Sequence, residues 1–143
     1  MLRYKLLICA LILLIGCQVG PRKIDYGHDA CDFCKMTIVD QRHAAQLVTE
    51  KGRPYVFDAI ECMIRYQQET PQVYSYQLVA DYLTPGMLIS AEEATFMISQ
   101  EIPSPMGAFL SAFSDINQLN ALPESGEGKR YDWPEVQTVI LAK

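Results

Sequence analysis

Two thiols and a thioether lie within six residues of each other near the start of the folded part of the chain. Cys31 and Cys34 have Cys-x-x-Cys spacing, Met36 follows two positions later, and a second sulfur pair, Cys62-Met63, lies further along. Thiolate and thioether sulfurs are soft ligands, which bind Cu(I) in preference to hard cations such as Mg²⁺ and Ca²⁺. The arrangement therefore predicts a Cu(I) site.

Cys34 and Met36 are the predicted ligands. In an extended segment, residues two apart point to the same side, so both sulfurs can reach one ion. A thioether carries no charge and loses no proton on binding, which keeps the site weak enough to release copper. A cage of three thiolates would hold copper more tightly, which suits storage better than transfer.

Four other side chains are candidate additional donors: Cys31, Cys62, His28 and Met106. Cys62 lies near the predicted start of a helix, where the helix dipole favours a thiolate. It also falls on the apolar face of that helix, where cysteine is often a small buried hydrophobe. His28 lies three residues before Cys31, and Met106 lies in a Pro-Met-Gly loop, so both are placed to approach a metal.

Two other functions would use the same cysteines. A thiol-disulfide oxidoreductase would use Cys31 and Cys34, although such a motif normally opens a helix that lowers the pKa of the first thiol, and Thr37-Ile38-Val39 predicts a strand here. A structural zinc module would use Cys31, Cys34, His43 and Cys62, although zinc sites usually contain a second close pair of ligands. A hydrolase is not supported, because the chain has two histidines and no Ser-His-acid pattern.

The N-terminus has the pattern of an export signal. Two basic residues precede Leu6–Ile15, an apolar run of ten residues, which is shorter than the roughly 20 residues of a membrane-spanning helix. The run ends in Leu14-Ile15-Gly16-Cys17, which looks like the lipobox of bacterial lipoproteins. We predict a signal peptide over residues 1–16, a lipid on Cys17 that anchors the protein to a membrane, and a polar tether over residues 17–30. The expected location is the periplasm.

Composition and charge limit the class of partner. The chain of 143 residues has a net charge of −5, and an acidic chain lacks the basic patches that nucleic acid requires. Of the five cysteines, Cys9 would leave with the signal and Cys17 would be lipidated, which leaves three thiols in an oxidising compartment. At least one of them stays unpaired, and an unpaired thiol persists there more easily when it is buried or bound to metal.

Each half of the chain is predicted to contain two strands, a helix and a further strand, in that order. A capping box formed by Asp58 and Glu61 opens the first helix, and Ser114 caps the second. The order indicates an α+β fold of two sequential ββαβ units, residues 31–84 and 85–143, packed together. The expected strands cover residues 37–39, 43–49, 54–57 and 73–83 in the first half, and 94–99, 108–113 and 136–141 in the second.

Four segments resemble the NosL family of copper-binding lipoproteins, in the same order and with compatible spacing. They are Cys34-Lys35-Met36-Thr37-Ile38, Ala44-Ala45-Gln46, Phe57-Asp58-Ala59-Ile60-Glu61-Cys62-Met63 and Ser104-Pro105-Met106-Gly107. The resemblance runs from about Cys31 to Leu122. The Cys-x-Met and Phe-Asp-x-x-x-Cys-Met elements together are specific, whereas either alone would be weak.

The resemblance implies a fold and a function. The fold is a pair of ββαβ units, distantly similar to the organomercurial lyase fold. The function is Cu(I) binding through Cys34 and Met36 by a metallochaperone, not an enzyme, that delivers copper to apo nitrous oxide reductase and its assembly proteins. Whether Cys31 is a ligand, a redox partner of Cys34 or neither stays open.

Overall fold

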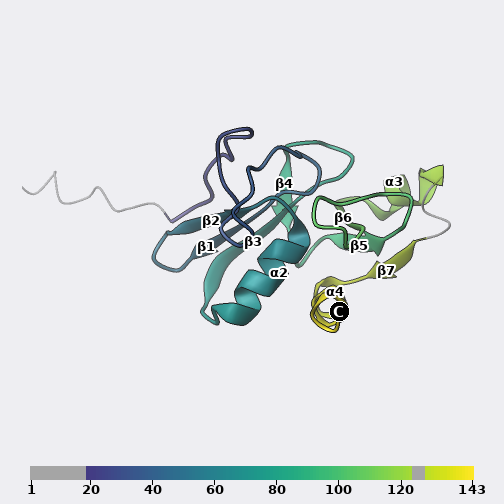
Figure 1. Ribbon diagram of the computed structural model, residues 1–143. Helices are drawn as coiled ribbons and strands as arrows, with labels where there is room; N and C mark the ends of the chain where they lie inside the picture. The colour runs from purple at the N-terminus through teal and green to yellow at the C-terminus, as the bar shows by residue number, and fades with distance from the viewer. Residues whose placement is uncertain (1–18, 124–127) are drawn as a thin grey trace, which may run out of the picture.

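The structure contains two sheets, and the first begins at Ala45, after a segment that from residue 19 onward has no long strand or helix (Figure 1). The computed structural model describes residues 19–123 and 128–143. The sheet has four antiparallel strands in the order β2-β1-β3-β4, and helix α2 (Ile60–Glu69) packs on β1 and β2. The strands are β1 (Ala45–Thr49), β2 (Pro54–Phe57), β3 (Tyr74–Ala80) and β4 (Leu88–Ser90).

The second sheet repeats the arrangement with shorter strands. It is antiparallel, with the order β6-β5-β7, and helix α3 (Ile116–Ala121) connects β6 to β7. Its strands are β5 (Thr95–Ile98), β6 (Leu110–Phe113) and β7 (Lys129–Tyr131). In both sheets the first strand lies between the second and the third, so the predicted α+β fold of two ββαβ units is confirmed.

Two strands were predicted where the structure has none. Residues 37–39 contain a single bridge, between Thr37 and Ala30, because the chain enters from a turn rather than from an extended segment. Residues 136–141 belong to helix α4 (Trp133–Leu141), which packs beside α2 (Figure 1). The β-branched residues of that stretch favoured a strand, but Asp132 caps the helix in a capping box with Glu135 and Pro134 occupies the first turn.

The predicted helix caps were also displaced. Ala59 occupies the N-cap of α2 and no side chain caps it, because the Asp58 and Glu61 carboxylates make other contacts. The N-cap of α3 is Asp115, which accepts a hydrogen bond from the Asn117 backbone N–H. The Ser114 hydroxyl, predicted to cap this helix, instead donates to the Asp81 carboxylate.

The two units share one core, as predicted. A single cluster of buried apolar side chains includes Phe57 and Ile60 from the first unit and Phe96 and Leu110 from the second. Strand β4 lies after the predicted boundary at residues 84 and 85 but pairs with β3, so the first sheet also uses residues from beyond it. No helix of the described residues is long and apolar enough to cross a membrane.

The segment before the first sheet is docked onto it from Arg22 onward. The Arg22 backbone N–H donates to Gln46 Oε1 at 2.8 Å, and Gln46 Nε2 donates back to the Arg22 carbonyl at 2.8 Å. Ile24 is buried in the shared core. The Arg22 guanidinium forms an ion pair with Asp29 at 2.6 Å. Residues 22–30, predicted as part of a tether, therefore pack against the domain.

Candidate metal centre

A tight turn presents the first two cysteines. The Lys35 backbone N–H donates to the Cys31 carbonyl at 3.0 Å, and the Cys31 N–H donates to the Met36 carbonyl at 2.8 Å. Lys35 has a φ of 67°, in the left-handed region that closes such a turn. Asp32 fixes the turn to the edge of β2, because its N–H donates to the Val56 carbonyl and its carboxylate accepts from the Val56 N–H.

The turn meets the start of α2, and four potential ligands converge there. Cys31, Cys34, Asp58 and Cys62 each offer one ligand atom, and these atoms lie within 4.8 Å of one another. Asp58 comes directly after β2, and Cys62 lies in the first turn of α2. Cys31 and Cys62 are 0% and 1% exposed, whereas Cys34 is partly exposed. All three thiols are free.

Cys31 lies in a pocket of hydrogen-bond donors. The Cys62 thiol and the backbone N–H groups of Asp58, Cys34 and Phe33 are close to its sulfur and favour the thiolate. The hydrogen bond from Cys62 is the largest of several effects that lower the pKa of Cys31 from 9.0 to about 6, against the opposing effect of burial. Cys31 is therefore a thiolate at neutral pH, although it is fully buried.

The other two cysteines are protonated. Burial raises the pKa of Cys34 to about 11, and the neighbouring Cys31 and Asp58 add to the effect. The Cys34 thiol donates to Asp58 Oδ1 at 3.3 Å. The hydrogen bond to Cys31 and burial raise the pKa of Cys62. The centre thus combines one thiolate with two thiols, and a metal that binds all three sulfurs displaces two protons.

The methionine of the Cys-x-Met pair lies on the surface. Met36 is 58% exposed. Because Lys35 is left-handed, the expectation of an extended segment over Cys34 and Met36 is wrong. Met36 lies two residues beyond Cys34 at the outer end of the turn, where it remains a predicted ligand.

The loop that carries Met106 is tied to the helix next to the cysteines. Glu61 Oε1 accepts hydrogen bonds from the Ser104 hydroxyl at 2.6 Å and from the Ala108 N–H at 3.3 Å. Glu61 is buried and precedes Cys62 in α2. Met106 is exposed on this loop. The Ser-Pro-Met-Gly segment is thereby held at the same end of α2 as the cysteines.

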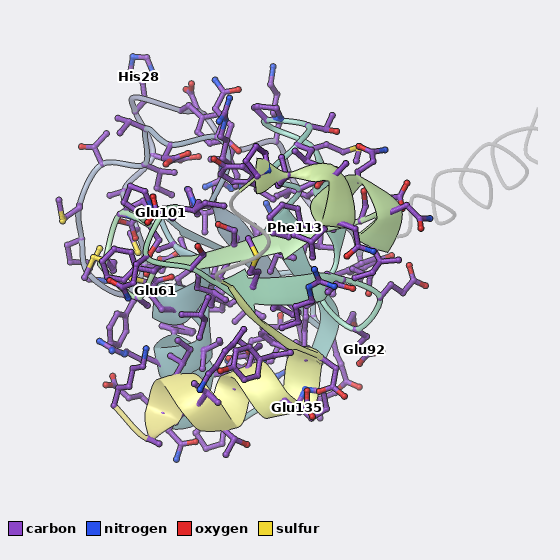
Figure 2. All side chains as sticks on the ribbon, turned by 90° about the vertical axis from the view of Figure 1, so that its right-hand side faces the viewer. His28, Glu61, Glu92, Glu101, Phe113 and Glu135 are labelled. Carbon is purple, nitrogen blue, oxygen red and sulfur yellow. The ribbon has the colours of Figure 1, made fainter. Side chains whose placement is uncertain are left out.

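The two histidines lie apart from the four converging ligands. Figure 2 shows His28 at the outer edge of the molecule, away from Glu61, and its ring contacts Asp25. His43 is buried with its ring nitrogens 2.8 Å from Asp40 and 3.1 Å from Ser111. The structure therefore does not bring His43 to the cysteines as a zinc module would require. Cys17 lies outside the described residues.

Sequence reasoning missed the role of Asp58. Its position before a helix and three residues from Glu61 is typical of a cap, and that pattern hid its approach to Cys34. The sequence did contain one signal for this role. Asp58 belongs to the Phe-Asp-x-x-x-Cys-Met element, in which the carboxylate lies four residues before Cys62.

Known proteins share both the sequence pattern and the fold. The NosL family model matches residues 22–141. The crystal structure of the copper chaperone NosL from Shewanella denitrificans is similar, with a TM-score of 0.69 and 22% sequence identity over 82% of this chain and 96% of that chain. The search of curated proteins found no match. Because the family model covers most of the chain, the protein belongs to the NosL family.

Proposed function

We infer that this protein is a Cu(I) carrier that delivers copper for assembly of the copper centres of nitrous oxide reductase. The observation that carries the proposal is the convergence of three free cysteine sulfurs, together with Asp58, within 4.8 Å in a chain of the NosL family. Soft sulfur donors favour Cu(I) over hard cations. Cys34 and Met36 are the ligands at the surface, where copper is exchanged with partners.

Metal carriage fits the centre better than thiol-disulfide exchange. An oxidoreductase needs an accessible thiol with a lowered pKa. Here the lowered pKa belongs to Cys31, which is 0% exposed, while burial raises the pKa of the accessible Cys34. The protein acts as a carrier and not as an enzyme, and it works in the periplasm, anchored through a lipid on Cys17.

Anaerobic titration of the reduced mature protein against a competing Cu(I) chelator tests the metal. We expect one Cu(I) per chain and strong discrimination against Zn²⁺ and Cu(II). Incubation of the loaded protein with apo nitrous oxide reductase then tests delivery, with copper transfer expected to exceed that from the free copper–chelator complex. Tight Zn²⁺ binding with Cu(I) left on the chelator would overturn the copper proposal.

A further inference from the structure

We propose that copper occupies two alternative positions in this protein, an inner one held by Cys31, Cys34 and Cys62 and an outer one held by Cys34 and Met36. This inference rests on the proposed function and adds where copper resides and how it leaves. Cys34 belongs to both positions. One Cu(I) therefore moves between them, and the chain never holds two.

The inner position is preformed. Cu(I) accepts two or three ligands, and the three cysteine sulfurs converge within 4.8 Å. Cys31 and Cys62 are 0% and 1% exposed, so two of the three sulfurs are shielded from solvent.

Asp58 supports the inner position without binding copper. Carboxylate oxygen is a hard ligand that suits Mg²⁺ or Ca²⁺ better than Cu(I). Its Oδ1 instead accepts a hydrogen bond from the Cys34 thiol at 3.3 Å. Asp58 therefore orients the Cys34 sulfur, and the metal environment of the inner position consists of sulfur alone.

The outer position follows from the gradient of exposure along the turn. Cys31 is 0% exposed, Cys34 is partly exposed and Met36 is 58% exposed. A partner protein cannot contact the sulfurs of Cys31 or Cys62 in this conformation, since both are buried. It can contact Cys34 and Met36, so copper must reach that pair before it is transferred.

Movement from the inner to the outer position is a ligand exchange without oxidation or reduction. The bonds from copper to Cys31 Sγ and Cys62 Sγ break, the bond to Cys34 Sγ persists, and a bond to Met36 Sδ forms. Copper stays Cu(I), and the two thiolates that leave copper take the protons they bind from water. Loss of two thiolates for one thioether weakens the hold on copper, which favours transfer.

The test separates equilibrium affinity from the rate of release. Met36→Leu conserves volume and should leave the Cu(I) affinity within threefold of wild type while slowing release to a chelator tenfold or more. Met87→Leu, at an exposed methionine away from the centre, is the matched control and should change neither. Cys31→Ser and Cys62→Ser should each weaken the affinity tenfold or more.

X-ray absorption spectroscopy of the loaded wild-type protein provides a measurement that needs no variant to fold. We expect three sulfur neighbours of copper in wild type and in Met36→Leu. Two sulfur neighbours in wild type, or a tenfold loss of affinity in Met36→Leu with Cys31→Ser and Cys62→Ser unchanged, would overturn the inner position while leaving copper carriage intact. Failure of the wild-type protein to bind Cu(I) would instead overturn the proposed function.

Discussion

Three cysteines with the same chemistry differ in protonation state, one thiolate and two thiols, because their surroundings differ. Cys31 is surrounded by N–H and S–H donors, Cys34 faces the Asp58 carboxylate, and Cys62 donates to Cys31. The sequence predicts Cys34 as a ligand from its spacing to Met36. It cannot predict the state of Cys31, since the Asp58 N–H that helps to stabilise the thiolate comes from a distant segment.

The Cys31 thiolate should be visible by its ultraviolet absorbance. Because the pKa of Cys31 is lowered from 9.0 to about 6, apo protein should gain thiolate absorbance with a midpoint near pH 6, and Cys31→Ser should lack this step. A lowered pKa stabilises the folded state fully above pH 9, and this stabilisation is lost as the pH falls through about 6. A first midpoint at pH 8 or above would contradict the assignment.

Among the elements, the helices show where local patterns mislead. Asp58 and Glu61 have the same spacing as Asp132 and Glu135, yet only the second pair forms a capping box. The carboxylates of the first pair instead accept hydrogen bonds from Cys34 and Ser104, which lie far from them in the sequence. Five predicted strands are present as β1, β2, β3, β5 and β6, whereas β4 and β7 were not predicted.

Glu61 should be worth more to stability than a surface carboxylate. Glu61→Ala removes the acceptor of the Ser104 hydroxyl and the Ala108 N–H, and should lower the free energy of unfolding by about 1–3 kcal/mol. Glu61→Gln keeps one carbonyl oxygen as acceptor and should stay within about 1 kcal/mol of wild type. Urea unfolding of the apo proteins measures both. Equal stability of the two variants would show that the hydrogen bonds to Oε1 contribute little.

At the scale of the whole molecule, the two ββαβ units depend on each other. The larger cluster of buried side chains contains residues of both units, and His43, which precedes β1, contacts Ser111 of β6 across the units. The repeated order of two strands, a helix and a strand could be predicted from the sequence. The pairing of β4 with β3 across the predicted boundary was not predicted. Helix α4 was missed although Asp132 and Glu135 form a local capping box, because the β-branched residues of this stretch favoured a strand.

Membrane attachment is a property of the whole chain that a single residue should control. Cys17→Ala removes the predicted acylation site, so the protein should leave the membrane fraction or accumulate as uncleaved precursor. Fractionation and the apparent mass of the product on a denaturing gel measure both outcomes. Normal cleavage and unchanged membrane retention in this variant would show that the lipobox assignment is wrong.

The hydrogen bonds between Arg22 and Gln46 limit the length of the linker between the predicted lipid anchor and the domain. With a lipid on Cys17, four residues lie between the anchor and Arg22, and the five steps from residue 17 to residue 22 span at most about 18 Å when fully extended. Arg22 is also paired with Asp29, two residues before Cys31, so the anchored end and the metal turn are joined. The copper site would then lie close to the bilayer surface. A membrane-associated acceptor protein would meet it by diffusion along the membrane instead of through the bulk solution.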